Sequence, residues 1–168
     1  MPDIGSIAVS VGQLLKQKGH TVAVAESSCG GLISASLVAV PGASAYYLGG
    51  VTVYTRLAQK ELLRVPEKAM DGKRASTEEY ALINASQLRL KFGTTWGLAE
   101  TGASGPTGNR YGDASGHACF AIVGPIERSF TLETAVSDRV ANMWTFTYAA
   151  LDLLEKTVLE SQGEAEVS

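Results

Sequence analysis

The chain has few of the residues that build disulfide frameworks and metal sites. Its 168 residues include two cysteines, Cys29 and Cys119, and two histidines, His20 and His117. The cysteines form no CxxC pair, and neither histidine stands at a metal-type spacing from a cysteine. We therefore expect no disulfide framework, no metal and no other cofactor. A few cysteines that stay reduced are typical of a cytoplasmic protein.

The sequence also lacks a strong charge of one sign and a long apolar run. The net charge is −3 without a basic block, which argues against nucleic-acid binding through phosphate neutralisation. No apolar run reaches the roughly 18 residues of a membrane span, and the first residues do not resemble a secretory signal. Hydrophobic residues make up 45% of the chain, as in an ordinary globular protein. The length predicts one domain over residues 1–168.

Hydrophobic periodicity predicts helices that separate the early strands and paired strands later in the chain. We expect helices near 4–18, 31–40, 57–63 and 76–92, strands near 22–24, 50–54 and 96–99, and paired strands at 116–123 and 129–135. Ser76 should cap the helix at 76–92, with Glu79 completing a capping box, and Ser137 should cap a final helix. The polar tail over 162–168 is expected to be frayed. This order favours the α/β class, as a three-layer α/β/α sandwich with a mixed, partly parallel sheet.

The most informative stretch is 21–33, which reads as a buried strand, a sharp polar turn and an apolar helix. The turn contains Ser27 and Ser28, followed by Gly30 and Gly31. A serine at such a junction can act as a nucleophile, and free N–H groups at the start of a helix can bind an anion. The alternative is a tight turn in which one of the serines caps the helix.

Ligands of such sheets bind outside the carboxyl ends of the strands. Three polar loops should therefore converge, at 27–31, 54–59 and 101–108. The glycines and hydroxyls of 101–108 suit a phosphate or a carboxamide, and Arg139 could pair with a phosphate. The alternatives are a long structural turn and a surface arginine near a helix cap.

A serine hydroxyl needs a partner that takes its proton. We expect His20 at the far end of the first strand and His117, which begins a strand, at the wrong edge of the sheet, so no Ser-His-Asp triad is evident. Tyr54 or Lys60 is the remaining partner for Ser27. The alternatives are a core aromatic for Tyr54 and a solvated helix face for Lys60.

Four motifs, in one order over nearly the whole chain, resemble the CinA C-terminal domain family. The family patterns A-E-S-C-T-G-G, Y-S/T-N-x-A-K, T-G-I-A-G-P-x-G and G-D-R have counterparts at 25–31, 54–59, 101–108 and 137–139. The resemblance implies the α/β/α architecture. Stand-alone members of the family include amidases that convert nicotinamide mononucleotide to nicotinate mononucleotide and ammonia.

The resemblance implies a catalytic serine at Ser27, supported by Tyr54, and a small nucleotide as ligand. The substrate-binding positions that it implies are Cys29, Gly30, Gly31, Gln59, Thr101, Gly102, Gly105 and Arg139. It also implies a homo-oligomer and no metal.

The activating lysine of the family falls on Gln59, and a neutral amide cannot accept the proton of a serine. Lys60 is next in sequence, but one residue on a helix turns the side chain by about 100°. The alternative function is therefore a domain that binds a nucleotide or phosphate ligand without catalysis.

Overall fold

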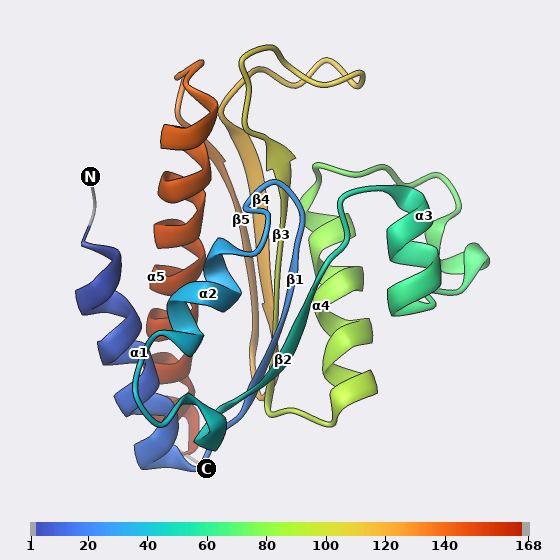
Figure 1. Ribbon diagram of the computed structural model, residues 1–168. Coiled ribbons are helices and arrows are strands. Elements are labelled where there is room, and N and C mark those ends of the chain that lie inside the picture. Colours follow the sequence, from blue (N-terminus) through green and yellow to red (C-terminus); the bar gives the residue numbers. More distant parts are fainter. Residues whose placement is uncertain (1–2, 166–168) are drawn as a thin grey trace.

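The computed structural model describes residues 3–165 and contains one mixed five-stranded sheet (Figure 1). The strands are β1 (Val22–Glu26), β2 (Tyr47–Thr52), β3 (Trp96–Ala103), β4 (His117–Val123) and β5 (Glu127–Glu133). Their order in the sheet is β2-β1-β3-β4-β5. Strand β1 runs parallel to β2 and β3, whereas β4 runs antiparallel to β3 and β5. The predicted α/β class with a mixed, partly parallel sheet is confirmed.

Helices cover both faces of the sheet. They are α1 (Ile4–Lys18), α2 (Leu32–Val38), α3 (Arg56–Ala58), α4 (Glu78–Phe92) and α5 (Arg139–Ala165). Short 3₁₀ turns occupy Ala43–Ala45 and Glu67–Met70, and a π-helical turn at Gln59–Leu63 directly follows α3. Helices α1, α2 and α5 lie on one face, and α4 lies on the other with α3 beyond it (Figure 1). Within 3–165, no helix has both the length and the apolar character that crossing a membrane requires.

Successive side chains along each strand point to opposite faces of the sheet, so the interior has two hydrophobic cores. Val22 and Val24 of β1 face the core formed with α1, α2 and α5, which also contains Trp96 and Phe120. The residues between them, such as Ala23, face the core formed with α4. The sheet side chains in this second core are small, so α4 can lie close to the strands.

Gly97 shows how close α4 comes to the centre of the sheet. A Cβ atom at this position would lie 2.1 Å from the carbonyl oxygen of Ala85 and 2.8 Å from the Cβ of Arg89. Both of these residues belong to α4. The helix therefore packs directly on the backbone of β3, and only glycine fits between them.

Two predicted helix caps are wrong by one residue. Thr77, not Ser76, caps α4 and accepts a hydrogen bond from the Tyr80 N–H at 3.2 Å. Ser76 has φ of +59°, outside the extended region that an N-cap residue adopts. At α5, the Asp138 carboxylate accepts the Ala141 N–H at 3.0 Å, because an anion suits this end of a helix better than a hydroxyl does.

The predicted tail is also corrected. Helix α5 continues to Ala165, so the frayed tail is wrong over 162–165, and residues 166–168 lie outside the described residues. Strand β3 is longer than predicted and includes Thr101 and Gly102. The start of the glycine-rich segment is thus part of the sheet, which fixes its position.

We predict that Gly97→Ala lowers the free energy of unfolding by about 1–3 kcal/mol, because the added methyl group must push α4 away from β3. Gly5→Ala is the matched control, since the nearest atom to its new Cβ would be Asp3 Oδ1 at 3.5 Å and alanine favours the helix. Urea denaturation of both variants is the measurement. Equal effects of the two substitutions would contradict the packing described for Gly97.

Candidate functional site

A buried glutamate at the end of β1 holds the start of α2. The carboxylate of Glu26 accepts hydrogen bonds from the N–H groups of Gly31, Ile33 and Ser34 at 3.2, 2.8 and 2.9 Å. It also accepts the Ser34 hydroxyl at 2.6 Å, and its side chain is almost fully buried. Free N–H groups at a helix start attract anions. Here the chain supplies that anion itself.

A second buried glutamate, Glu100 of β3, holds the turn between β1 and α2. It accepts the N–H groups of Ser27 at 3.0 Å and Cys29 at 2.9 Å, and the hydroxyl of Ser28. Burial raises the pKa of Glu100 above its ordinary value, and the three hydrogen bonds oppose this rise. The two glutamates together fix the shape of the turn.

The backbone N–H groups of Cys29, Gly30 and Gly31, which the resemblance places among the substrate-binding positions, are engaged within the chain. The N–H groups of Cys29 and Gly31 bind the two glutamates, and the N–H of Gly30 donates to the Ser27 carbonyl at 3.1 Å. None of the three residues lines either chamber of the cleft described below. Cys29 is fully buried, and burial raises the pKa of its thiol well above the ordinary value. Their assignment to ligand binding stays a prediction.

A cleft lies at the carboxyl edge of the parallel strands and has two neighbouring chambers. The larger has a volume of about 640 Å³, and its lining includes Ser27 and Thr101. The smaller has a volume of about 240 Å³, and its lining includes Gly105 and Arg139. Tyr54, Gly102 and Asn109 line both chambers. The three predicted loops thus meet at one cleft, while the roles of these residues stay predictions.

Arg139 connects the loops around the smaller chamber. Its Nη1 donates to the Gly105 carbonyl at 2.6 Å, and its Nη2 donates to the Tyr54 hydroxyl at 2.9 Å. The Ser104 hydroxyl also belongs to this chamber, is buried, and has no hydrogen-bond partner among residues 3–165. A buried polar atom of this kind is costly unless something pairs with it. The smaller chamber therefore offers the guanidinium group of Arg139 to a ligand, while the Ser104 hydroxyl lies buried behind its surface.

Gln59 lines neither chamber of the cleft, and its assignment as a substrate-binding residue stays a prediction. It is 1% exposed, and its Nε2 donates to Asn84 Oδ1 at 2.6 Å. Its Oε1 accepts Nη1 of Arg56 at 2.5 Å. Lys60, the next residue, points outward and pairs with Glu67 at 2.8 Å. Neither residue is placed to take a proton from Ser27.

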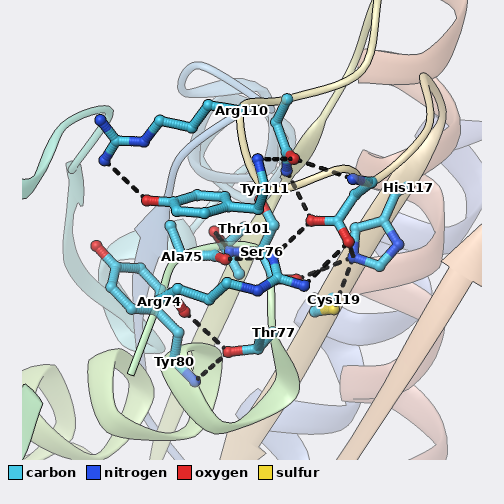
Figure 2. Close-up of polar contacts among 12 residues, drawn as sticks. Arg74, Ala75, Ser76, Thr77, Tyr80, Thr101, Arg110, Tyr111, His117 and Cys119 are labelled. Atoms are coloured by element: carbon cyan, nitrogen blue, oxygen red, sulfur yellow. Dashed lines mark hydrogen bonds and ion pairs between the residues drawn. The ribbon is translucent and has the colours of Figure 1, made fainter. Parts of the chain in front are cut away.

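Ser76 and Thr101 of the larger chamber belong to a polar network that the sequence did not reveal and that continues behind the chamber wall (Figure 2). Thr101 Oγ1 accepts the Ser76 N–H at 3.1 Å, and Nε2 of His117 lies 2.9 Å from the Ser76 carbonyl. Nδ1 of His117 contacts the carboxylate of Glu133. The prediction that His117 lies at the wrong edge is therefore wrong. Because β4 runs antiparallel to β3, its first residue pairs with Ala103 at the end of β3.

The segment after the third motif supplies the rest of this wall. Arg74 forms a two-pronged ion pair with Asp113 at 2.6 and 3.0 Å, and Asp113 also accepts from Asn109 Nδ2 at 2.8 Å. Arg110 donates to the Tyr111 hydroxyl at 2.8 Å. The polar run from Asn109 to Asp113 was the signal in the sequence that could have indicated this wall. In the part of the chain that the structure describes, no cluster of three or more metal-ligating side chains occurs.

Comparison with known proteins agrees with this geometry. The sequence model of the family, described as the CinA C-terminal domain, matches residues 5–158 of this chain. The chain belongs to the CinA C-terminal domain family. A CinA-like protein of Geotalea uraniireducens is 33% identical over 97% of this chain and 39% of its own length. A CinA-like protein of Synechococcus strain RCC307 is 37% identical over 84% of this chain and 34% of its own length. The CinA-type domain thus spans roughly a third of these relatives.

Solved structures of the CinA superfamily share the fold. One from Klebsiella pneumoniae has a TM-score of 0.88 at 21% identity, over 94% of this chain and 99% of that one. One from Escherichia coli has a TM-score of 0.85 at 21% identity, over 95% and 93% of the two chains.

We predict that His117 stabilises the CinA-type fold at low pH. Burial opposes its charged form, but Glu133, the Ser76 carbonyl and Asp113 outweigh burial and raise its pKa above the ordinary 6.5. A raised histidine pKa gives stability below 6.5 that is lost as pH rises through the folded-state pKa. His117→Gln should therefore cost more unfolding free energy at pH 5.5 than at pH 8.5, measured by urea denaturation.

His20→Gln is the matched control for this prediction. Burial and Lys18 lower the pKa of His20, so its wild-type contribution falls as pH falls. Its substitution should show the opposite pH trend. A flat difference between wild type and His117→Gln across this pH range would contradict the role assigned to His117.

Proposed function

We propose that this chain binds a small phosphorylated nucleotide in the cleft at the carboxyl edge of the sheet, without the serine–lysine hydrolysis of the family amidases. The observation that carries the proposal is the position of Gln59. It replaces the lysine of the family pattern, is buried, and holds its amide against Asn84 and Arg56.

The smaller chamber suits the phosphate group. Arg139 has five N–H donors, and two bonds in the protein leave donors for a phosphate oxygen. The hydroxyl of Tyr54 adds a neutral donor. A phosphate that contacts Arg139 would leave the rest of the nucleotide in the larger chamber, beside Ser27 and Thr101.

Catalysis by Ser27 lacks a visible proton acceptor. No hydrogen bond within residues 3–165 reaches the hydroxyl of Ser27 from another side chain. Gln59 cannot accept a proton at neutral pH, and Lys60 is paired with Glu67 on the outside. A serine without a base or a relay is a weak nucleophile.

Hydrolysis of nicotinamide mononucleotide is the second candidate, favoured by the presence of Ser27, Tyr54 and Thr101 in one chamber. Ser27 would attack the carboxamide carbon, ammonia would leave, and water would cleave the acyl-enzyme. Tyr54 would carry protons in this mechanism. A cytoplasmic location stays a proposal that rests on the cysteine usage, and a homo-oligomeric state stays one that rests on the family resemblance.

We predict that Arg139→Gln weakens binding of nicotinamide mononucleotide at least about tenfold, because charged hydrogen bonds to phosphate contribute about 1.5–3 kcal/mol. Isothermal titration calorimetry is the measurement. Arg128→Gln is the matched control, since Arg128 pairs with Glu160 on the surface and lines neither chamber. Unchanged affinity in Arg139→Gln would rule out the smaller chamber as the phosphate site.

We further predict that wild-type protein releases no more ammonia from nicotinamide mononucleotide than Ser27→Ala does. The double variant Arg56→Asn, Gln59→Lys restores both residues of the family pattern and should gain release that depends on Ser27. A coupled ammonia assay on the purified proteins measures both. Wild-type release that disappears in Ser27→Ala would instead establish the hydrolytic candidate.

A further inference from the structure

The larger chamber of the cleft is lined by cations and lacks carboxylates. Arg56 and Arg110 contribute to its lining, together with Tyr54, Tyr80 and Tyr111. None of the residues that line it is an aspartate or a glutamate. Within residues 3–165, neither arginine forms an ion pair with a carboxylate. Both guanidinium groups are therefore available to a ligand.

Arg56 is held at this chamber by the residue that replaces the family lysine. Nη1 of Arg56 donates to Oε1 of Gln59, and Nε2 of Gln59 donates to Asn84 Oδ1 and contacts Met70 Sδ at 3.7 Å. Both ends of the buried amide are thus engaged. Gln59 orients the guanidinium of Arg56, which remains charged at any physiological pH. The positive charge of the site has moved from position 59 to position 56.

Arg110 contributes the second cation from the wall formed after the third motif. Its guanidinium carbon lies 5.0 Å from the centre of the Tyr111 ring, and its side chain extends along that ring (Figure 2). Arg74 lies at the same distance from this ring, but Asp113 neutralises its charge. Arg110 therefore keeps a free charge where Arg74 does not.

We propose that the larger chamber binds a second anionic group, a carboxylate or a phosphate, with Arg56 as its main ligand. This inference rests on the proposed binding of a nucleotide in the same cleft. The guanidinium fork matches the two oxygens of such a group. The ring of nicotinamide mononucleotide is a pyridinium cation with a neutral amide, so two nearby arginines repel it. A nucleotide that carries an acid at this end fits better.

Matched pairs of nucleotides that differ in one anionic group test the inference by calorimetry. Nicotinic acid mononucleotide should bind wild-type protein about tenfold or more tightly than nicotinamide mononucleotide does. Adenosine 3′,5′-bisphosphate against adenosine 5′-monophosphate is the second pair, and it distinguishes a phosphate from a carboxylate as the second anion. A preference for the more anionic member of either pair supports the inference.

The variants assign the preference to Arg56. Arg56→Gln should abolish it, and Arg56→Lys should retain part of it, because lysine keeps the charge without the fork. Lys60→Gln is the matched control. It removes the same charge four residues further along the chain, from a side chain that pairs with Glu67 outside the cleft. Arg56 and Lys60 are both exposed, and thermal unfolding of the three variants checks that the fold is retained, because Arg56 also donates to the buried amide of Gln59.

The outcomes separate this inference from the nucleotide proposal. Equal binding within both pairs overturns the second anion site and leaves nucleotide binding standing. No binding of any of the four nucleotides overturns both. A preference that survives in Arg56→Gln overturns the role of Arg56.

Discussion

The turn after β1 depends on hydrogen bonds to two buried carboxylates, Glu26 and Glu100. This turn carries Ser27 of the larger chamber and Ser28 of the smaller one, and α2 begins at its end. Burying a carboxylate is costly unless several donors surround it. Each of these two has at least three donors, and most are backbone N–H groups that would otherwise need water.

The sequence predicted the fold well because its signals are local. Alternating valines and alanines, glycines after helices and hydrophobic periodicity each act over a few residues. The carboxyl-edge rule then brought the loops of Ser27, Tyr54 and Thr101 to one cleft, as the structure has them. The order of strands β1, β2 and β3 made this possible, because parallel strands end at the same edge.

The errors concern interactions between distant parts of the chain. Glu100 bonds to a turn 73 residues away, and no local pattern indicates that its carboxylate replaces a ligand. The edge predicted for His117 was wrong because the first residue of a strand does not show whether the strand runs parallel or antiparallel to its neighbour. The resemblance implies Gln59 at the binding site, but a motif position alone does not say how deep a side chain lies. Its burial depends on Asn84 and Met70, which come from other elements.

The self-contained turn has a consequence for the family as a whole. In many α/β proteins the backbone amides at a helix start bind the ligand. A change of ligand preference there also requires a change in the backbone that forms the fold. Here the internal glutamates accept those amides, and the proposed recognition uses side chains such as Arg56, Arg110 and Arg139 on separate loops. Single substitutions in these loops can exchange one small molecule for another while the framework stays intact. In such an arrangement, substitutions in the loops can remove or change the activity while the fold is retained.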